Sequence, residues 1–207
     1  MKTIGKLIVV TTLVVIVFGL PKAAEAENVF RITQQIASAS FSSTDPSGCI
    51  LTDVSVFATE AVVQFPPGQG DSSSNGFVSI SQFDNCLGTQ MLGATGLTPL
   101  ADEDFQLSPT LDSATLNASI NVNDWVSGTS FDVSVNLIWT STDPLGRLNS
   151  HNHDSLPGCK TNSHSTYAFR PAQASGTISD GATNFTPEVG YGELSSGRAG
   201  NVDIGCE

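Results

Sequence analysis

The chain has 207 residues, of which eight are lysine or arginine and 20 are aspartate or glutamate, so its formal net charge is −12 at pH 7. A surface this acidic repels phosphate backbones and anionic lipid headgroups, and we therefore expect neither nucleic acid nor a membrane surface as a partner. With so few bases, we expect apolar burial and cross-links, rather than ion pairs, to stabilise the fold.

Residues 1–26 have the three parts of a secretory signal peptide. Two lysines open the segment, an apolar run occupies residues 7–20, and a small-x-small cleavage site ends at Ala26. The run is shorter than the roughly 20 residues that a spanning helix needs, so we expect cleavage and no membrane insertion afterwards. The protein is then secreted, to the extracellular space or the periplasm, as one domain over 27–207. This domain has five strong bases and nineteen carboxylates, a net charge of −14.

All four cysteines lie in the mature part of the chain, at Cys49, Cys86, Cys159 and Cys206. An even number of cysteines in an exported protein favours disulfides over free thiols, because the compartment is oxidising. We therefore expect two disulfide bonds. The sequence alone allows three pairings of the four cysteines.

Apolar residues alternate with polar residues along much of the mature chain. The longest examples are 114–122 and 131–139, and shorter ones are 54–57 and 78–81. A period of two is typical of a strand with one face in a core, whereas no stretch has the spacing of an amphipathic helix. Turn-rich stretches such as 66–76 separate these runs. We predict an all-β fold, a disulfide-stabilised β-sandwich of about nine strands, with a closed barrel as the alternative.

Two parts of the chain share an ordered set of landmarks. In each, an aromatic residue precedes a Ser-Thr-Asp-Pro turn, Gly-Cys follows, and an aromatic-Ala pair comes eight residues after the cysteine. This order suggests an internal duplication, with halves of about 27–125 and 126–207. Chance similarity in a chain rich in serine and threonine is the alternative. If the halves correspond, the symmetric disulfides are Cys49–Cys86 and Cys159–Cys206.

All three histidines fall within fifteen residues, in the second set of landmarks. In the second set, thirteen residues separate the proline from the Gly-Cys pair, whereas in the first set one residue does. The second set therefore carries an inserted loop, 145–157, which contains His151, His153 and Asp154. Scaffolds often carry functional groups on inserted loops. Histidines at i and i+2 can chelate zinc or copper, with Asp154 as a ligand or orienting partner and His164 as a third nitrogen. The alternative is an ordinary polar loop.

The remaining features give weaker indications of function. Asp102, Glu103 and Asp104 follow a turn and could bind calcium, with a solvated acidic loop as the alternative. We expect Trp139 in the core, because it ends an alternating strand, and Trp125 at the surface, because it lies between Asp124 and a Ser-Gly turn. No Gly-x-Ser-x-Gly motif occurs, and nothing singles out a catalytic pair of carboxylates such as Glu60 and Asp84, so we expect a protein without catalytic activity. We predict a secreted binding or surface-associated protein whose extracellular ligand is unknown, with a metalloprotein or metalloenzyme based on the three histidines as the competing function.

Overall fold

The computed structural model describes residues 31–65, 69–156, 159–186 and 188–206, with side chains omitted at 65, 69, 152–156, 159–163 and 201–206. The expected signal peptide lies outside the described residues. Within them no helix is long and apolar enough to cross a membrane. The described residues form strands and no helix, which confirms the all-β fold. The ten strands are β1 (Arg31–Thr44), β2 (Ile50–Phe65), β3 (Gln69–Asp84), β4 (Thr89–Pro99), β5 (Phe105–Leu107), β6 (Ser113–Asp124), β7 (Thr129–Ser141), β8 (Gly146–Leu156), β9 (Cys159–Ser179) and β10 (Gly190–Cys206).

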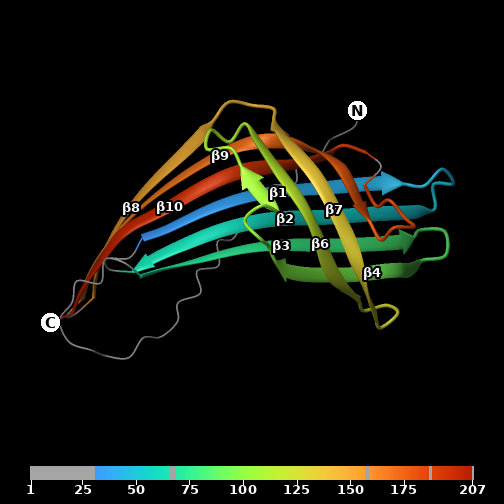
Figure 1. Ribbon diagram of the computed structural model, residues 1–207, viewed down its shortest axis with the longest axis horizontal. Coiled ribbons are helices and arrows are strands. Elements are labelled where there is room, and N and C mark those ends of the chain that lie inside the picture. Colours follow the sequence, from blue (N-terminus) through green and yellow to red (C-terminus); the bar gives the residue numbers. More distant parts are fainter. Residues whose placement is uncertain (1–30, 66–68, 157–158, 187, 207) are drawn as a thin grey trace.

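These strands belong to one antiparallel sheet. Its hydrogen-bonded order is β10-β1-β2-β3-β4-β6-β7-β9-β8, with β5 paired to β6. Because β9 also pairs with β10, the order returns to the strand from which it started. Figure 1 shows β6 and β7 crossing over the layer formed by β1 to β4. The two layers expected of a sandwich are therefore parts of a single wrapped sheet.

The core lies between these two layers. Along β7 every second side chain is buried, as the alternating sequence predicts: Val133, Val135, Leu137 and Trp139. Trp139 has no exposed surface, and its indole Nε1 donates a hydrogen bond to the Ser38 carbonyl of β1 over 2.9 Å. This contact joins the two layers. Trp125 is 58% exposed, so both tryptophans lie where the sequence predicts.

Beyond the core the sheet continues as a mostly polar extension. We call this extension the arm and define it as residues 31–35 of β1, 60–65 of β2, 69–74 of β3, 146–156 of β8, 159–168 of β9 and 196–206 of β10. In the arm, β8, β9 and β10 run side by side past the region that β6 and β7 cover (Figure 1).

Two segments of the arm are strands where the sequence indicates loops. The stretch 66–76 is expected to be a loop, whereas β3 begins at Gln69. The insertion 145–157 is expected to be a loop, whereas β8 occupies Gly146–Leu156. Both predictions are wrong for one reason. Pairing with β2 and β9 satisfies the backbone hydrogen bonds of these two segments. Because they lie outside the core, neither face of them has to be apolar, so their sequences lack the alternation of apolar and polar residues that indicates a strand.

Cys49 and Cys86 form a disulfide that ties the start of β2 to the end of β3, with their Cα atoms 5.3 Å apart. The bond confirms one member of the predicted symmetric pairing and agrees with an oxidising compartment. Cys159 and Cys206 are register partners at the matching ends of β9 and β10. Their side chains lie outside the described residues, so the second disulfide and the internal duplication stay predictions.

Candidate functional site

His151 and His164 lie side by side on neighbouring strands of the arm. They are register partners in the β8–β9 pair, and their ring centroids are 4.2 Å apart with the ring planes at 89°. Both residues are exposed. The structure thus brings together two of the predicted metal ligands. The edge-to-face arrangement is also one that two aromatic rings adopt without any metal.

His153 and Asp154 follow in β8, opposite Asn162 and Thr161 of β9. Their side chains lie outside the described residues. Their part in a metal site therefore stays a prediction.

Of the three acidic residues proposed for calcium, Asp104 has a structural role in a turn. The Asp104 carboxylate accepts a hydrogen bond of 2.9 Å from the Ala101 N–H, and Asp102 and Glu103 are exposed. Among the described residues, a single group of three potential ligands has its ligand atoms within 4.8 Å of one another, namely Cys49, Asp84 and Cys86. Its two sulfurs are joined in the disulfide, so this group does not offer a metal site.

An open cleft of about 650 Å³ lies where β1, β2 and the segment leading into β10 meet. Its most exposed ring is that of Tyr191, which is 74% exposed. Two carboxylates and three serine hydroxyls provide the other polar groups of the lining. The lining residues are Ser40, Phe41, Ser42, Asp53, Val54, Ser55, Glu188, Val189 and Tyr191.

Strand pairing sets the order of the polar groups in this cleft. Ser40 of β1 is the register partner of Tyr191 in β10 and of Ser55 in β2, so these three residues form one row across the sheet. Ser42 and Asp53 form the next row. All five residues are exposed. No sequence pattern indicates this site, because its residues come from distant segments that the pairing of β10 with β1 brings together.

An exposed apolar row continues the same face of the sheet. Phe57, two residues after Ser55 in β2, stacks on Phe77 of β3 with ring centroids 4.6 Å apart. Leu97 of β4 is the register partner of Phe77 and is 63% exposed. Because residues two apart in a strand share a face, this row lies beside the cleft and extends the surface that a ligand can contact.

No family model matches the chain, and no curated protein matches it. One solved structure, a candidate AttH protein from Nitrosomonas europaea, is similar at 13% identity and a TM-score of 0.34. The match covers 87% of this chain and 52% of that one, so the chain spans about half its length. An acetoacetate decarboxylase-like enzyme from Sphingomonas wittichii is similar at 9% identity and a TM-score of 0.24, over 92% of this chain and 98% of that one. Likenesses this distant carry no argument about function.

Proposed function

We propose that the protein is exported and acts as a non-catalytic binding protein, with a hydroxyl-rich ligand such as a neutral oligosaccharide in the cleft around Tyr191. The observation that carries this proposal is the Tyr191 ring, which is 74% exposed in a cleft whose other polar side chains are serines and carboxylates. Aromatic residues of this kind are enriched at binding surfaces, because a flat ring offers a large contact area at little cost in conformational entropy.

Export is supported by two independent features. The pattern of residues 1–26 matches a secretory signal peptide. The Cys49–Cys86 disulfide is of a kind that persists in oxidising compartments and is rare in the cytosol.

The chemistry of the cleft suits a ligand with many hydroxyl groups. The carboxylates of Asp53 and Glu188 accept hydrogen bonds, and serine hydroxyls both donate and accept them. The Tyr191 ring offers an apolar face to the C–H groups of a sugar ring. Among the described residues, the lining contains no lysine, arginine or histidine, so none of them offers a counter-charge to an anionic ligand or a base to activate a serine.

Calorimetric titration of the mature protein with neutral hexasaccharides of glucose and of N-acetylglucosamine tests this proposal. We expect at least one of them to bind, and Tyr191→Ala to weaken its binding by about tenfold because the stacking surface is lost. Tyr191→Phe keeps the ring and should retain most of the affinity. Leu148→Ala is the control, because Leu148 is similarly exposed, at 61%, but belongs to the arm.

Two results would contradict the proposal. The cleft is not the site if no saccharide binds or if Tyr191→Ala binds as tightly as the unchanged protein. Release of shorter saccharides during the titration would overturn the non-catalytic part, because Asp53 and Glu188 would then act as an acid and base pair.

A second candidate function, transition-metal binding, is favoured by the 4.2 Å contact between His151 and His164. Two imidazoles on adjacent strands can chelate zinc or copper. If the protein has this function, the mature protein binds about one equivalent of metal, and each of the variants His151→Ala and His164→Ala loses that metal. The variant His153→Ala reports whether position 153 supplies a third ligand. Titration without stoichiometric binding of either metal would reject this candidate.

A further inference from the structure

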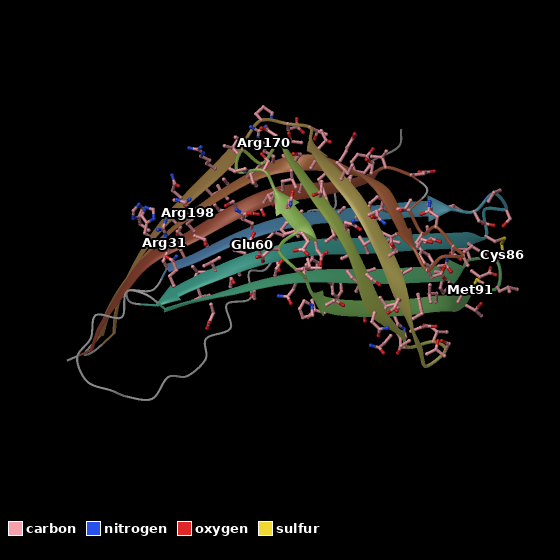
Figure 2. The ribbon with its side chains drawn as sticks, in the orientation of Figure 1. Arg31, Glu60, Cys86, Met91, Arg170 and Arg198 are labelled. Atoms are coloured by element: carbon pink, nitrogen blue, oxygen red, sulfur yellow. A yellow bond between two sulfur atoms is a disulfide. The ribbon has the colours of Figure 1, made fainter. Side chains whose placement is uncertain are left out.

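Positive charge is concentrated in one part of this acidic molecule. Of the five strong bases after residue 26, three are exposed arginines of the arm: Arg31, Arg147 and Arg198. Lys160 also belongs to the arm, although its side chain lies outside the described residues. Arg170 is half-buried and forms a salt bridge of 2.6 Å with Asp112. Figure 2 shows Arg31 and Arg198 near each other on the arm and Arg170 away from them.

Arg31 and Arg198 lie on the same face of the sheet. Residues two apart in a strand share a face, and so do register partners in neighbouring strands. Arg31 is two residues from Thr33 in β1, and Thr33 is the register partner of Arg198 in β10. The two arginines are thus diagonal neighbours, a relation that places residues about 7–8 Å apart. Their face is a continuation of the core face, because Thr33 and the fully buried Ala37 are four residues apart.

The same face continues across β9 and β8. Arg198 is the register partner of Thr166, which is two residues from His164. His164 is the register partner of His151, and Arg147 lies four residues before His151 in β8. All three arginines and both histidines therefore share one face of the arm.

We call this set of residues the basic face: Arg31, Arg147, Arg198, His151 and His164, with the polar residues Thr33, Gln35, Asn149 and Thr166 between them. Among the described side chains of the arm, the carboxylate on this face is that of Glu60, the register partner of Gln35. Asp154 and Asp203 also belong to the arm, with side chains outside the described residues. The layer of β6 and β7 leaves this part of the sheet uncovered (Figure 1).

Grouped arginines of this kind repel one another, and a bound anion removes that repulsion. An arginine guanidinium binds a carboxylate through two parallel hydrogen bonds, and the hydroxyls and amides between the arginines suit a hydroxylated carrier of those carboxylates. The net charge of −14 on the mature chain repels a long polyanion. The expected ligand is therefore short.

We propose that the basic face binds a short anionic saccharide whose carboxylates pair with Arg31 and Arg198. This site is separate from the cleft around Tyr191. Ser40, in the cleft, belongs to the opposite face of β1 and to its other end, so each proposal can fail without the other.

Binding of trigalacturonate to the Tyr191→Ala variant tests the proposal, because the substitution removes the contribution of the cleft. We expect calorimetric binding that weakens as salt is added. The double variant Arg31→Gln, Arg198→Gln should bind at least about tenfold more weakly, since each arginine loses charge-assisted hydrogen bonds. Glu60→Gln should bind more tightly, because it removes a like charge from the site without removing a base.

Controls separate the basic face from the arm as a whole. Leu148→Gln changes the opposite face of β8, next to Arg147, and should leave the affinity unchanged. Equal binding by the double arginine variant, or no binding of trigalacturonate at all, would overturn the proposal. So would equally tight binding of neutral trigalactose or of inorganic phosphate, because the ligand would then not be an anionic saccharide.

Discussion

At the scale of single residues, Asp124 lies where β4 and β6 meet, the junction of the sheet with the fewest register pairs. β4 and β6 are joined by two register pairs, one of which is Ala94 with Asp124. The Asp124 carboxylate, 5% exposed, accepts hydrogen bonds from the N–H groups of Gly93, Val126 and Ser127 and from the Ser127 hydroxyl. The Ser127 hydroxyl is the largest cause that lowers the pKa of Asp124, with the three backbone amides adding to it against the opposing effect of burial.

We therefore predict that Asp124→Ala destabilises the protein by about 2 kcal/mol or more, because buried donors lose their acceptor. The exposed Asp132, which accepts one side-chain hydrogen bond from Asn121, provides the control. Urea denaturation of Asp124→Ala and Asp132→Ala measures the difference. Equal losses would contradict this role for Asp124.

The same group gives the protein a pH-dependent stability. The folded state lowers the pKa of Asp124 below its ordinary value of 3.8. The stabilisation is therefore complete above pH 3.8 and is lost as the pH falls through the lower pKa of the folded state. Asp124→Asn should reduce the dependence of the melting temperature on pH in this acidic range.

Tyr167 has the opposite pH dependence. Burial, followed by the hydrogen bond that its hydroxyl donates to Glu193 Oε1 over 2.6 Å, raises the pKa of Tyr167 from 10.0 to about 12. The unfolded chain loses the phenol proton near pH 10, whereas the folded chain keeps it, so this stabilisation is present below pH 10 and is lost as the pH rises to about 12.

Tyr167→Phe should accordingly show a shallower loss of unfolding free energy between pH 10 and about 12 than the unchanged protein. The other tyrosine, Tyr191, is 74% exposed and serves as the control through Tyr191→Phe. If both variants lose unfolding free energy as steeply as the unchanged protein over this range, the buried phenol of Tyr167 is not the cause of the pH dependence.

At the scale of strands, sequence periodicity predicts the elements that form the core and misses those outside it. The alternating runs at 114–122 and 131–139 correspond to β6 and β7, because each strand has to bury one face. β8 and the first half of β3 have no such requirement, and their serines, glycines and asparagines resemble a loop. His151 and His164 could be proposed as neighbours from the sequence. The cleft and the basic face depend on the register of β10 with β1, which composition does not encode.

The matching ends of the β2–β3 and β9–β10 hairpins lead to a prediction about the second disulfide. Cys49 and Cys86 are bonded at one hairpin, and Cys159 and Cys206 are register partners at the other. Peptide mapping of the unreduced mature protein should therefore recover both Cys49–Cys86 and Cys159–Cys206. Recovery of free Cys159 and Cys206, or of any cross-pairing, would contradict the symmetric arrangement.

At the scale of the whole molecule, the sheet has a part with a buried core and an arm that extends beyond it. The core joins two layers of one sheet, and the Trp139 indole bridges them through its hydrogen bond to the Ser38 carbonyl. The arm has few buried side chains and carries most of the positive charge. The two proposed binding surfaces differ accordingly: the cleft around Tyr191 lies on the outer side of the core part of the sheet, and the basic face lies on the arm.

Trp139→Phe should thus destabilise the protein by about 1–3 kcal/mol, through the lost hydrogen bond and the cavity that the smaller ring leaves. Trp125→Phe is the matched control, because Trp125 is 58% exposed. Thermal unfolding compares the two variants, and a similar effect of both substitutions would show that Trp139 does not couple the layers.

We propose above all that the cleft around Tyr191 is the binding site. The most direct test is to add a neutral hexasaccharide to the mature protein and to map the NMR shifts of its backbone amides. We predict saturating shifts of the amides in the row Ser40, Ser55 and Tyr191 and of the adjoining Phe57, and no shifts of His151 and His164. Shifts confined to the arm, or no saturating shifts for any hexasaccharide that is tested, would contradict it.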